Sequence, residues 1–301
     1  MRGHRHSALV VLLVLLVACA PAATPTLSPT PTPSLKGKVS VGDHQLYFRC
    51  SGAGSPTVVV EEGYAMAGAS TRAWDAVLAG VEPVTRICLY DRAPLGLSKA
   101  DIPVRTCDEV VEDLHKLLQN AHIGGPYVLV GHSLGGFYVR YYATKYADEL
   151  VGTVLVDAKP PDSTARELAL LPPASPTEAE SITSVREGLV EELADSAGAN
   201  AERLNFVAAN EQAAKLTTLG DMPLVVLSRS PTPAVTYVSG LPADLEAGLE
   251  QLWQDMQVEQ SKLSTKGSLV VATQAGHRIH VDEPQLVIDA ILQVVEEARK
   301  R

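Results

Sequence analysis

The sequence predicts an α/β domain with a doubly wound, mostly parallel eight-stranded sheet, and three observations lead to this fold class. Short apolar runs without polar alternation recur from residue 37 onward, which is typical of strands buried on both faces. Helical patterns lie between several of these runs, and repeated strand–helix units favour parallel strands joined by right-handed crossovers. The chain has 301 residues, which is enough for one large domain that needs no metal or disulfide to fold.

Eight apolar runs are the expected strands, and the first two form a hairpin that turns at Gly42 and Asp43. The predicted strands cover residues 38–41, 45–49, 57–60, 84–90, 127–130, 153–156, 224–227 and 268–271. Apolar residues at helical spacing predict helices over residues 107–119, 134–145 and 284–300.

Residues 159–221 interrupt this alternation. They hold a proline-rich piece at 171–176, followed by polar helical sequence over 177–216. A connection of this length inside a compact domain is usually functional. We therefore expect a helical cap insertion over an active site, the alternative being a surface insertion without such a role.

The first 18 residues are predicted to be a bacterial lipoprotein signal peptide. Arg2 and Arg5 precede an apolar run over 8–18, which is shorter than the ~20 residues that a spanning helix needs. The run ends in Leu-Val-Ala-Cys, which resembles a lipobox, so Cys19 is the expected lipidation site. The alternative is an ordinary signal peptide cleaved within 18–23, which would give a secreted protein.

Residues 19–36 are expected to form the lipidated cysteine and a tether rich in proline and threonine, ahead of a catalytic domain over 37–301. Such a composition favours an extended chain and cannot build a core. The formal net charge of −10 argues against nucleic acid as a partner and against electrostatic binding to an anionic membrane. The lipid anchor is therefore the one membrane contact that we expect.

Three further cysteines, Cys50, Cys88 and Cys107, permit at most one internal disulfide. Thiols outside the cytoplasm can oxidise. Because Cys50 and Cys88 lie on predicted strands that we expect to be neighbours, they are the first candidates for a pair. The alternative is three buried thiols that pack as small apolar side chains.

The motif Gly-His-Ser-Leu-Gly-Gly at residues 131–136 supplies the expected nucleophile, Ser133. A serine hydroxyl reacts only when a base takes its proton and hydrogen-bond donors stabilise the oxyanion. Gly-x-Ser-x-Gly suits a strained turn between strand and helix, since small neighbours let the backbone fold sharply. A predicted strand precedes the motif and a predicted helix follows it. The N–H group of Leu134, at the start of that helix, is an expected oxyanion donor.

At this motif the chain resembles the α/β-hydrolase family, over nearly all of residues 40–297. Two further motifs carry the resemblance: Pro-Thr-Val-Val-Val-Glu-Glu-Gly at 56–63 and Tyr-Asp-Arg-Ala-Pro-Leu-Gly-Leu-Ser at 90–98. Pro94 stands where glycine is usual, and we expect it to stiffen the loop without removing catalysis. The resemblance implies a serine hydrolase that uses no metal and no cofactor.

The resemblance also implies the second oxyanion donor, the N–H group of Tyr64. Relatives often carry His-Gly-x after the corresponding strand, whereas this chain has Glu62, Gly63 and Tyr64. The donor is a backbone group, so replacing histidine by glutamate need not remove it. A carboxylate pointing into an oxyanion hole would be costly. We therefore expect Glu62 to face away or to pair with a cation such as Arg92.

The expected general base is His277, which follows a glycine between the last strand and the final helix, as in the family. His280 is the second candidate, and we expect it to pack or cap locally. His132 is next to the nucleophile in sequence, but on a sharp turn it should point away from Ser133.

The triad acid is expected to be Asp157. The family most often places the acid after the seventh strand, but residues 228–233 contain no carboxylate. Asp157 follows the sixth predicted strand and keeps the chain order Ser, Asp, His. Asp244 and Glu246 are the alternatives.

These residues predict an extracytoplasmic, lipid-anchored enzyme that cleaves a small carboxylic ester through an acyl-enzyme on Ser133. Amide or imino-peptide hydrolysis, C–C bond hydrolysis, acyl transfer and perhydrolysis are alternatives within the fold. The serine nucleophile argues against haloalkane dehalogenase chemistry, for which relatives use aspartate. A surface binding protein on a hydrolase scaffold is the alternative from another class.

Overall fold

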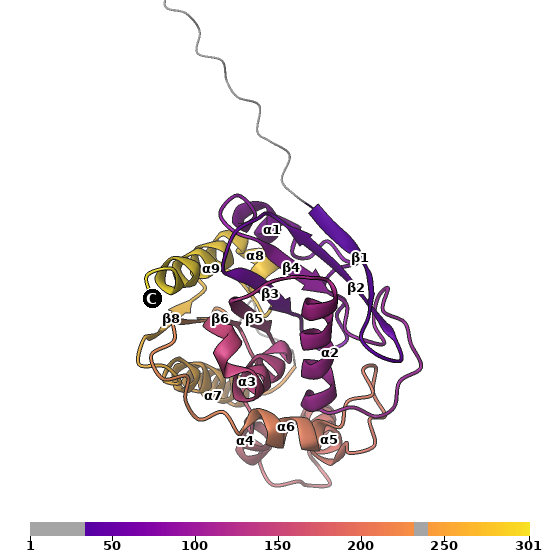
Figure 1. Ribbon diagram of the computed structural model, residues 1–301. Coiled ribbons are helices and arrows are strands. Elements are labelled where there is room, and N and C mark those ends of the chain that lie inside the picture. Colours follow the sequence, from indigo (N-terminus) through magenta and orange to yellow (C-terminus); the bar gives the residue numbers. More distant parts are fainter. Residues whose placement is uncertain (1–33, 232–239) are drawn as a thin grey trace, which may run out of the picture. The chain divides into compact units, whose positions relative to one another are not determined.

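A computed structural model describes residues 34–231 and 240–301, and its centre is an eight-stranded sheet (Figure 1). The strand order is β1-β2-β4-β3-β5-β6-β7-β8. β1 pairs antiparallel with β2, β2 pairs antiparallel with β4, and the remaining pairs are parallel. The predicted fold class is therefore confirmed. The predicted signal peptide, Cys19 and the tether as far as residue 33 lie outside the described residues.

All eight expected strands are present. They are β1 (Ser34–Ser40), β2 (Gln45–Ser51), β3 (Thr57–Glu61), β4 (Ile87–Tyr90), β5 (Tyr127–His132), β6 (Leu150–Val156), β7 (Leu224–Ser228) and β8 (Gly267–Val271). β1 begins at Ser34, so residues 34–36 belong to the sheet and not to the predicted tether. Their backbone pairs with the end of β2, where Ser34 lies opposite Ser51.

Helices cover both faces of the sheet (Figure 1). On one face lie α1 (Asp75–Val81), α8 (Ile279–Asp282) and α9 (Pro284–Ala298), and on the other lie α2 (Cys107–Asn120), α3 (Gly135–Lys145) and α7 (Ala243–Ser261). Side chains of a strand alternate between the faces. Accordingly Val58 and Val60 of β3 pack in one core and Val59 packs in the other.

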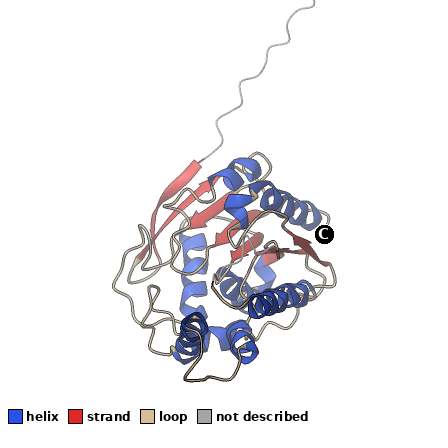
Figure 2. Cartoon of the chain, turned by 180° about the vertical axis from the view of Figure 1, so that it is seen from behind, coloured by secondary structure: helices blue, strands red, loops and turns tan. Residues whose placement is uncertain are grey.

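Residues 159–221, which we call the cap, contain three helices. These are α4 (Ser163–Leu170), α5 (Glu180–Ala194) and α6 (Phe206–Ala213). α4 precedes the proline-rich piece, so helical structure begins earlier than the sequence pattern indicated. The view from behind places the cap helices at the end of the molecule away from α1 and α9 (Figure 2).

A disulfide joins Cys50 to Cys88, as expected for the first candidate pair. The two residues lie directly opposite each other in the antiparallel pairing of β2 with β4. Cys107 is a buried free thiol at the start of α2.

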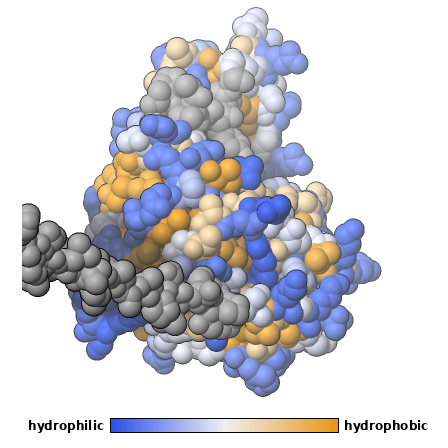
Figure 3. Space-filling view, turned by 90° about the horizontal axis from the view of Figure 1, so that it is seen from above, coloured by the Kyte–Doolittle hydropathy of each residue, from blue (hydrophilic) through white to orange (hydrophobic). Residues whose placement is uncertain are grey.

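Hydrophilic and hydrophobic residues are interspersed on the face seen from above (Figure 3). Among the helices of residues 34–231 and 240–301, none combines the length and apolar character needed to cross a bilayer.

Candidate active site

Ser133 lies on a strained turn between β5 and α3. Its φ of 51° is in the left-handed region, which costs free energy for a residue other than glycine. Three hydrogen bonds hold the turn: the Ser133 N–H donates to Val156 O at 3.3 Å, and the Ser133 carbonyl accepts from Gly136 N at 3.0 Å and from Lys159 N at 2.9 Å. The strain is thus maintained by β6 and by the first residue of the cap.

The small residues of the motif are required by close packing. A Cβ on Gly135 would lie 2.1 Å from the carbonyl oxygen of Glu61, and one on Gly131 would lie 2.9 Å from the carbonyl oxygen of Gly135. Such distances are far below van der Waals contact. Ser133 is therefore brought against the end of β3 because its neighbours lack side chains.

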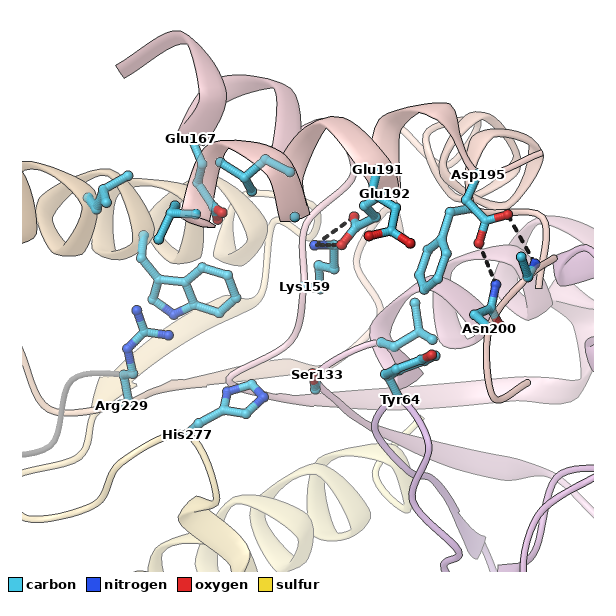
Figure 4. A pocket seen from close by; sticks show the side chains of 18 residues that line it. Tyr64, Ser133, Lys159, Glu167, Glu191, Glu192, Asp195, Asn200, Arg229 and His277 are labelled. Atoms are coloured by element: carbon cyan, nitrogen blue, oxygen red, sulfur yellow. Dashed lines mark hydrogen bonds and ion pairs between the residues drawn. The ribbon is translucent and has the colours of Figure 1, made fainter. Parts of the chain in front are cut away.

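A cavity of about 610 Å³ opens over Ser133, between the sheet and the cap (Figure 4). Ser133 and His277 form its floor, and α5 and α6 contribute Leu189 and Phe206 to its walls. The lining also carries several charged side chains, among them Lys159, Glu167 and Arg229, and a concave cleft of this size is the usual form of a small-molecule site. The expected cap therefore does border the pocket that contains the expected nucleophile.

His277 and Asp157 are hydrogen-bonded to each other, with 2.6 Å between Nδ1 and Oδ2. Asp157 is fully buried at the end of β6, and Figure 4 shows the His277 ring beside Ser133. Because Nδ1 faces the carboxylate, Nδ1 carries the hydrogen of the neutral ring and Nε2 is left as the basic nitrogen. Burial lowers the pKa of His277, and the bond to Asp157 opposes part of that shift. The ring is therefore neutral near pH 7, as a general base requires.

Asp157 is held as a carboxylate by three donors in addition to His277. Oδ1 accepts from the indole N–H of Trp253 at 2.7 Å and from the backbone N–H of Arg229 at 3.0 Å, and Nη1 of Arg229 lies 3.3 Å from Oδ2. Burial alone would favour the neutral acid, but the His277 bond and the Arg229 charge keep the pKa of Asp157 below its usual value.

The carboxylate at Nδ1 of His277 is that of Asp157, and the alternative acids lie on α7. Asp244 and Glu246 lie in the first turn of α7 and are not among the residues that line the cavity. The same helix instead supplies Trp253 to Asp157, and Glu250, whose carboxylate is 2.8 Å from Nη2 of Arg229. The sequence pattern did not predict that Trp253, Glu250 and Arg229 support Asp157. Arg229 stands directly after β7, the position where the family most often places the triad acid.

Glu62 pairs with His132 and not with Arg92, which corrects one of the two expectations for its carboxylate. Oε1 accepts from Gly63 N at 2.8 Å and lies 2.6 Å from His132 Nδ1, and Oε2 accepts from the indole N–H of Trp74. These bonds lower the pKa of Glu62 well below its usual value despite burial, which would raise it. The carboxylate is therefore ionised and engaged on both oxygens.

His132 joins this carboxylate to the loop that carries His277. Its Nε2 lies 3.0 Å from the backbone carbonyl oxygen of His277, while its Nδ1 faces Glu62. Both neighbours are acceptors, so both ring nitrogens must carry a hydrogen. His132 therefore points away from Ser133, as expected, and positions the backbone of His277.

His280 packs locally, as expected for the second histidine candidate. Its ring stacks on Trp74 with centroids 4.3 Å apart, and burial lowers its pKa to about 3. Ligand atoms of His280, Glu62 and His132 lie within 4.8 Å of one another, a spacing that could hold a metal ion. Glu62 and His132 are already paired with each other, however, whereas neither ring nitrogen of the buried His280 has a hydrogen-bond partner in the described parts of the chain.

The two expected oxyanion donors border the same cavity. The N–H groups of Leu134 and Tyr64 donate to no acceptor within the described parts of the chain. Gly63 brings the Tyr64 loop close to Ser133, since a Cβ on Gly63 would lie 3.2 Å from Cβ of Ser133. Backbone donors from two different elements thus lie beside Ser133.

Comparison with known proteins agrees with this architecture. The sequence profile described as "Alpha/beta hydrolase family" matches residues 48–290. Uncharacterized protein YqjL of Bacillus subtilis (strain 168) is 30% identical over 243 residues, which cover 81% of this chain and 85% of YqjL.

Solved structures show the same fold at lower identity. A thermophilic esterase from Thermogutta terrifontis matches with a TM-score of 0.56 and 20% identity, over 88% of this chain and 99% of the esterase. A haloalkane dehalogenase variant from Bradyrhizobium elkanii matches with a TM-score of 0.62 and 14% identity, over 89% and 98%. Since two such different enzymes share it, the fold alone does not select a reaction. With a family profile that spans most of its length and a full set of matching strands, the chain belongs to the α/β-hydrolase family.

Proposed function

We propose that this protein is a serine hydrolase that cleaves carboxylic esters of small molecules through an acyl-enzyme on Ser133. The observation that carries the proposal is the hydrogen bond between His277 and Asp157 beside a serine on a strained turn. A neutral imidazole oriented by a buried carboxylate is the arrangement that activates a serine hydroxyl.

In the first half of the reaction, Ser133 Oγ attacks the ester carbonyl carbon while its proton passes to Nε2 of His277. The resulting imidazolium is stabilised by Asp157. The tetrahedral intermediate then collapses, the bond to the alcohol oxygen breaks, and His277 returns its proton to the departing alcohol. The acyl group remains esterified to Ser133.

In the second half, water replaces the alcohol. It loses a proton to His277 as it attacks the acyl carbon, and the second intermediate releases the carboxylic acid and restores the Ser133 hydroxyl. In both halves the N–H groups of Leu134 and Tyr64 hold the oxyanion. One such donor contributes about 10²- to 10³-fold in rate, because it is aligned before the charge develops.

Labelling with a fluorophosphonate probe tests the nucleophile. The wild-type protein should be labelled, Ser133→Ala should not be, and Ser175→Ala should label like wild type because Ser175 is an exposed residue of the cap. Absence of label on folded wild-type protein would favour a binding protein on a hydrolase scaffold. Label that persists in Ser133→Ala would move the nucleophile to another residue.

Aryl esters of increasing acyl length then test the substrate class. The expected result is hydrolysis that depends on Ser133 and falls once the acyl chain outgrows a cavity of about 610 Å³. A labelled enzyme that cleaves amides or transfers acyl groups in preference to hydrolysing any ester of the series would replace the ester proposal with one of those reactions.

We propose further that the enzyme is an extracytoplasmic lipoprotein anchored through Cys19. The basic start, the apolar run and the Leu-Val-Ala-Cys motif support this, and the Cys50–Cys88 disulfide suits an oxidising compartment. In a bacterial host, wild-type protein should sediment with membranes, and Cys19→Ala should appear in the soluble exported fraction. Equal distribution of the two proteins would remove the anchor from the proposal.

A further inference from the structure

In the loop after β3, the backbone N–H groups on either side of Tyr64 are both held by carboxylates. The Gly63 N–H donates to Glu62 Oε1 at 2.8 Å, and the Ala65 N–H donates to Oε1 of Glu202 at 2.7 Å. Between them, the N–H of Tyr64 has no acceptor in the described parts of the chain. The donor assigned above to the oxyanion is therefore flanked by two donors that are already occupied.

Arg92 fixes the direction of this free donor. Its Nη1 donates to the carbonyl oxygen of Glu62 and its Nη2 to that of Gly63, each at 2.6 Å. The Gly63–Tyr64 peptide is not among the cis bonds of the described chain, and in a trans peptide the C=O and N–H groups point in opposite directions. Holding the Gly63 carbonyl at Arg92 therefore turns the Tyr64 N–H to the other side of the loop. A turn bond from Met66 N, at 3.3 Å, holds the same carbonyl more weakly.

Glu202 of the cap holds Arg92 in this position. Oε2 accepts from Nε of Arg92 at 3.0 Å, and Oε1 accepts from Nη2 at 2.8 Å. Arg92 is 2% exposed and Glu202 is 3% exposed. Without Glu202, the buried guanidinium would lose both of its hydrogen bonds to a carboxylate and would keep only the more distant Glu61, 3.5 Å from Nη1, as a counter-charge. The Arg92 geometry thus depends on a side chain that the cap delivers.

Two more contacts join the cap to the same loop. The backbone N–H of Ala201 donates to the Tyr64 hydroxyl at 3.1 Å, and the rings of Tyr64 and Phe206 lie 5.6 Å apart. The loop that carries the oxyanion donor is therefore bound to three residues of the cap, within a stretch of six.

We propose that Glu202, acting through Arg92, is a positioning residue that aligns the Tyr64 N–H for the oxyanion, so that the oxyanion hole is complete only when the cap is seated. This proposal rests on the serine hydrolase function proposed above. If Glu202 and Arg92 were a purely structural ion pair, losing Glu202 would not act specifically on the transition state. The proposal instead requires that loss to weaken binding of the transition state and not binding of the substrate.

Glu202→Gln is the main test. Glutamine keeps an acceptor for the Ala65 N–H but removes the charge that holds Arg92. We expect kcat for an aryl ester to fall about 10-fold, within the 10²- to 10³-fold limit for complete loss of one donor, while KM changes less than about 3-fold. Affinity for a trifluoromethyl ketone, which forms a tetrahedral adduct with a serine, should fall by the same factor as kcat.

Glu178→Gln is the matched control. Glu178 forms a salt bridge with Arg186 at 2.6 Å within the cap, and neither residue lines the cavity. This variant breaks a cap ion pair of similar geometry at a distance from the Tyr64 loop, so kcat and trifluoromethyl ketone affinity should stay at the wild-type values. Glu202→Asp gives a second measurement: it keeps the charge but withdraws the carboxylate by one methylene group, and a smaller loss in the same direction is expected.

Three results would overturn the proposal: wild-type kcat in folded Glu202→Gln, a loss confined to KM, or an equal loss in Glu178→Gln. If Glu202→Gln does not fold, the kcat and inhibitor affinity of Glu202→Asp decide between the same outcomes. Failure of the proposed function is separate, since wild-type protein would then show neither fluorophosphonate labelling nor ester hydrolysis.

Discussion

Two adjacent carboxylates at the end of β3, Glu61 and Glu62, are both buried, and yet their pKa values are shifted in opposite directions. Burial raises the pKa of Glu61 to about 7, and its two partners only partly oppose that shift: one oxygen accepts from the Tyr90 hydroxyl at 2.7 Å, and the other lies 3.5 Å from Arg92. Glu62 is ionised because Gly63, Trp74 and His132 all donate to it. The number of donors, and not the depth of burial, decides which form is present.

The two residues also serve different halves of the site, because consecutive side chains of a strand point to opposite faces of the sheet. Glu62 lies on the base side, which we define as the network of Glu62, His132, His277 and Asp157. Glu61 lies on the oxyanion side, which comprises Glu61, Arg92, Glu202 and the Tyr64 N–H. The base side depends on ionised side chains, whereas the oxyanion side depends on backbone groups that an ion pair holds in place.

The largest expected effect lies on the base side, in Asp157→Asn. An asparagine cannot stabilise the imidazolium and can hold the His277 ring in the wrong tautomer, so kcat for an aryl ester should fall about 10⁴-fold. The measurement is steady-state kinetics, with the concentration of active sites determined by fluorophosphonate labelling. If kcat stays within about 10-fold of wild type, Asp157 is structural and the base side does not depend on its charge.

Glu62→Gln should have the next largest effect. Removing one partner of a buried ion pair typically costs about 3–5 kcal/mol, so the free energy of unfolding at pH 7 should fall by roughly that amount. Because the pKa of folded Glu62 lies below its usual value of 4.5, its stabilisation is present above pH 4.5 and is lost as the pH falls below that value. Urea unfolding should therefore show a difference from wild type that shrinks on acidification. A difference independent of pH would contradict an ionised Glu62.

Glu61→Gln should show the opposite dependence on pH. The pKa of folded Glu61 is raised, so its contribution is fully present below pH 4.5 and is lost as the pH rises towards about 7, by up to about 3 kcal/mol. The amide can still accept from Tyr90 and does not ionise. Urea unfolding of wild type from pH 5 to pH 8 should show this fall in stability, and the variant should show less of it. Parallel curves for the two proteins would mean that Glu61 is ionised throughout.

The smallest expected effect is that of Asp244→Asn. Asp244 lies in the first turn of α7, outside the residues that line the cavity. The kcat of the Asp244→Asn variant should remain within about twofold of wild type, in assays run beside Asp157→Asn. A large loss of kcat in this variant would indicate that the triad acid lies after β7, and it would contradict the assignment of Asp157 to the base side.

Local patterns predicted the features that depend on local sequence. The buried strands are continuous apolar runs, and the turn at Ser133 needs glycines at fixed offsets, so both could be read before the fold was known. Asp157 and His277, which the structure brings together, could be singled out for the same reason, since each follows a predicted strand. The Cys50–Cys88 pairing followed from the expected order of two neighbouring strands.

The supports of the site could not be predicted, because they are made by residues far apart in the chain. Glu202 is separated from Arg92 by 110 positions, and Trp253 from Asp157 by 96. α7 was missed because its buried face carries polar side chains and does not form an apolar stripe. Gln257 and Gln260 on that face both donate to the carbonyl oxygen of Ala158, the residue after Asp157. A helix built to bind polar groups gives no signal to a search for hydrophobic periodicity.

The position of the disulfide also determines how the domain responds to mechanical tension on its N-terminal side. A pull on the chain before Ser34 acts first on β1, which is the edge strand, is largely exposed and contacts β2 through backbone pairing. β1 can therefore peel away pair by pair. β2 is covalently joined to β4 through Cys50 and Cys88, so peeling stops at that bond and the force passes into the parallel strands together. The edge yields first, and the strands that carry Ser133 and Asp157 keep their register.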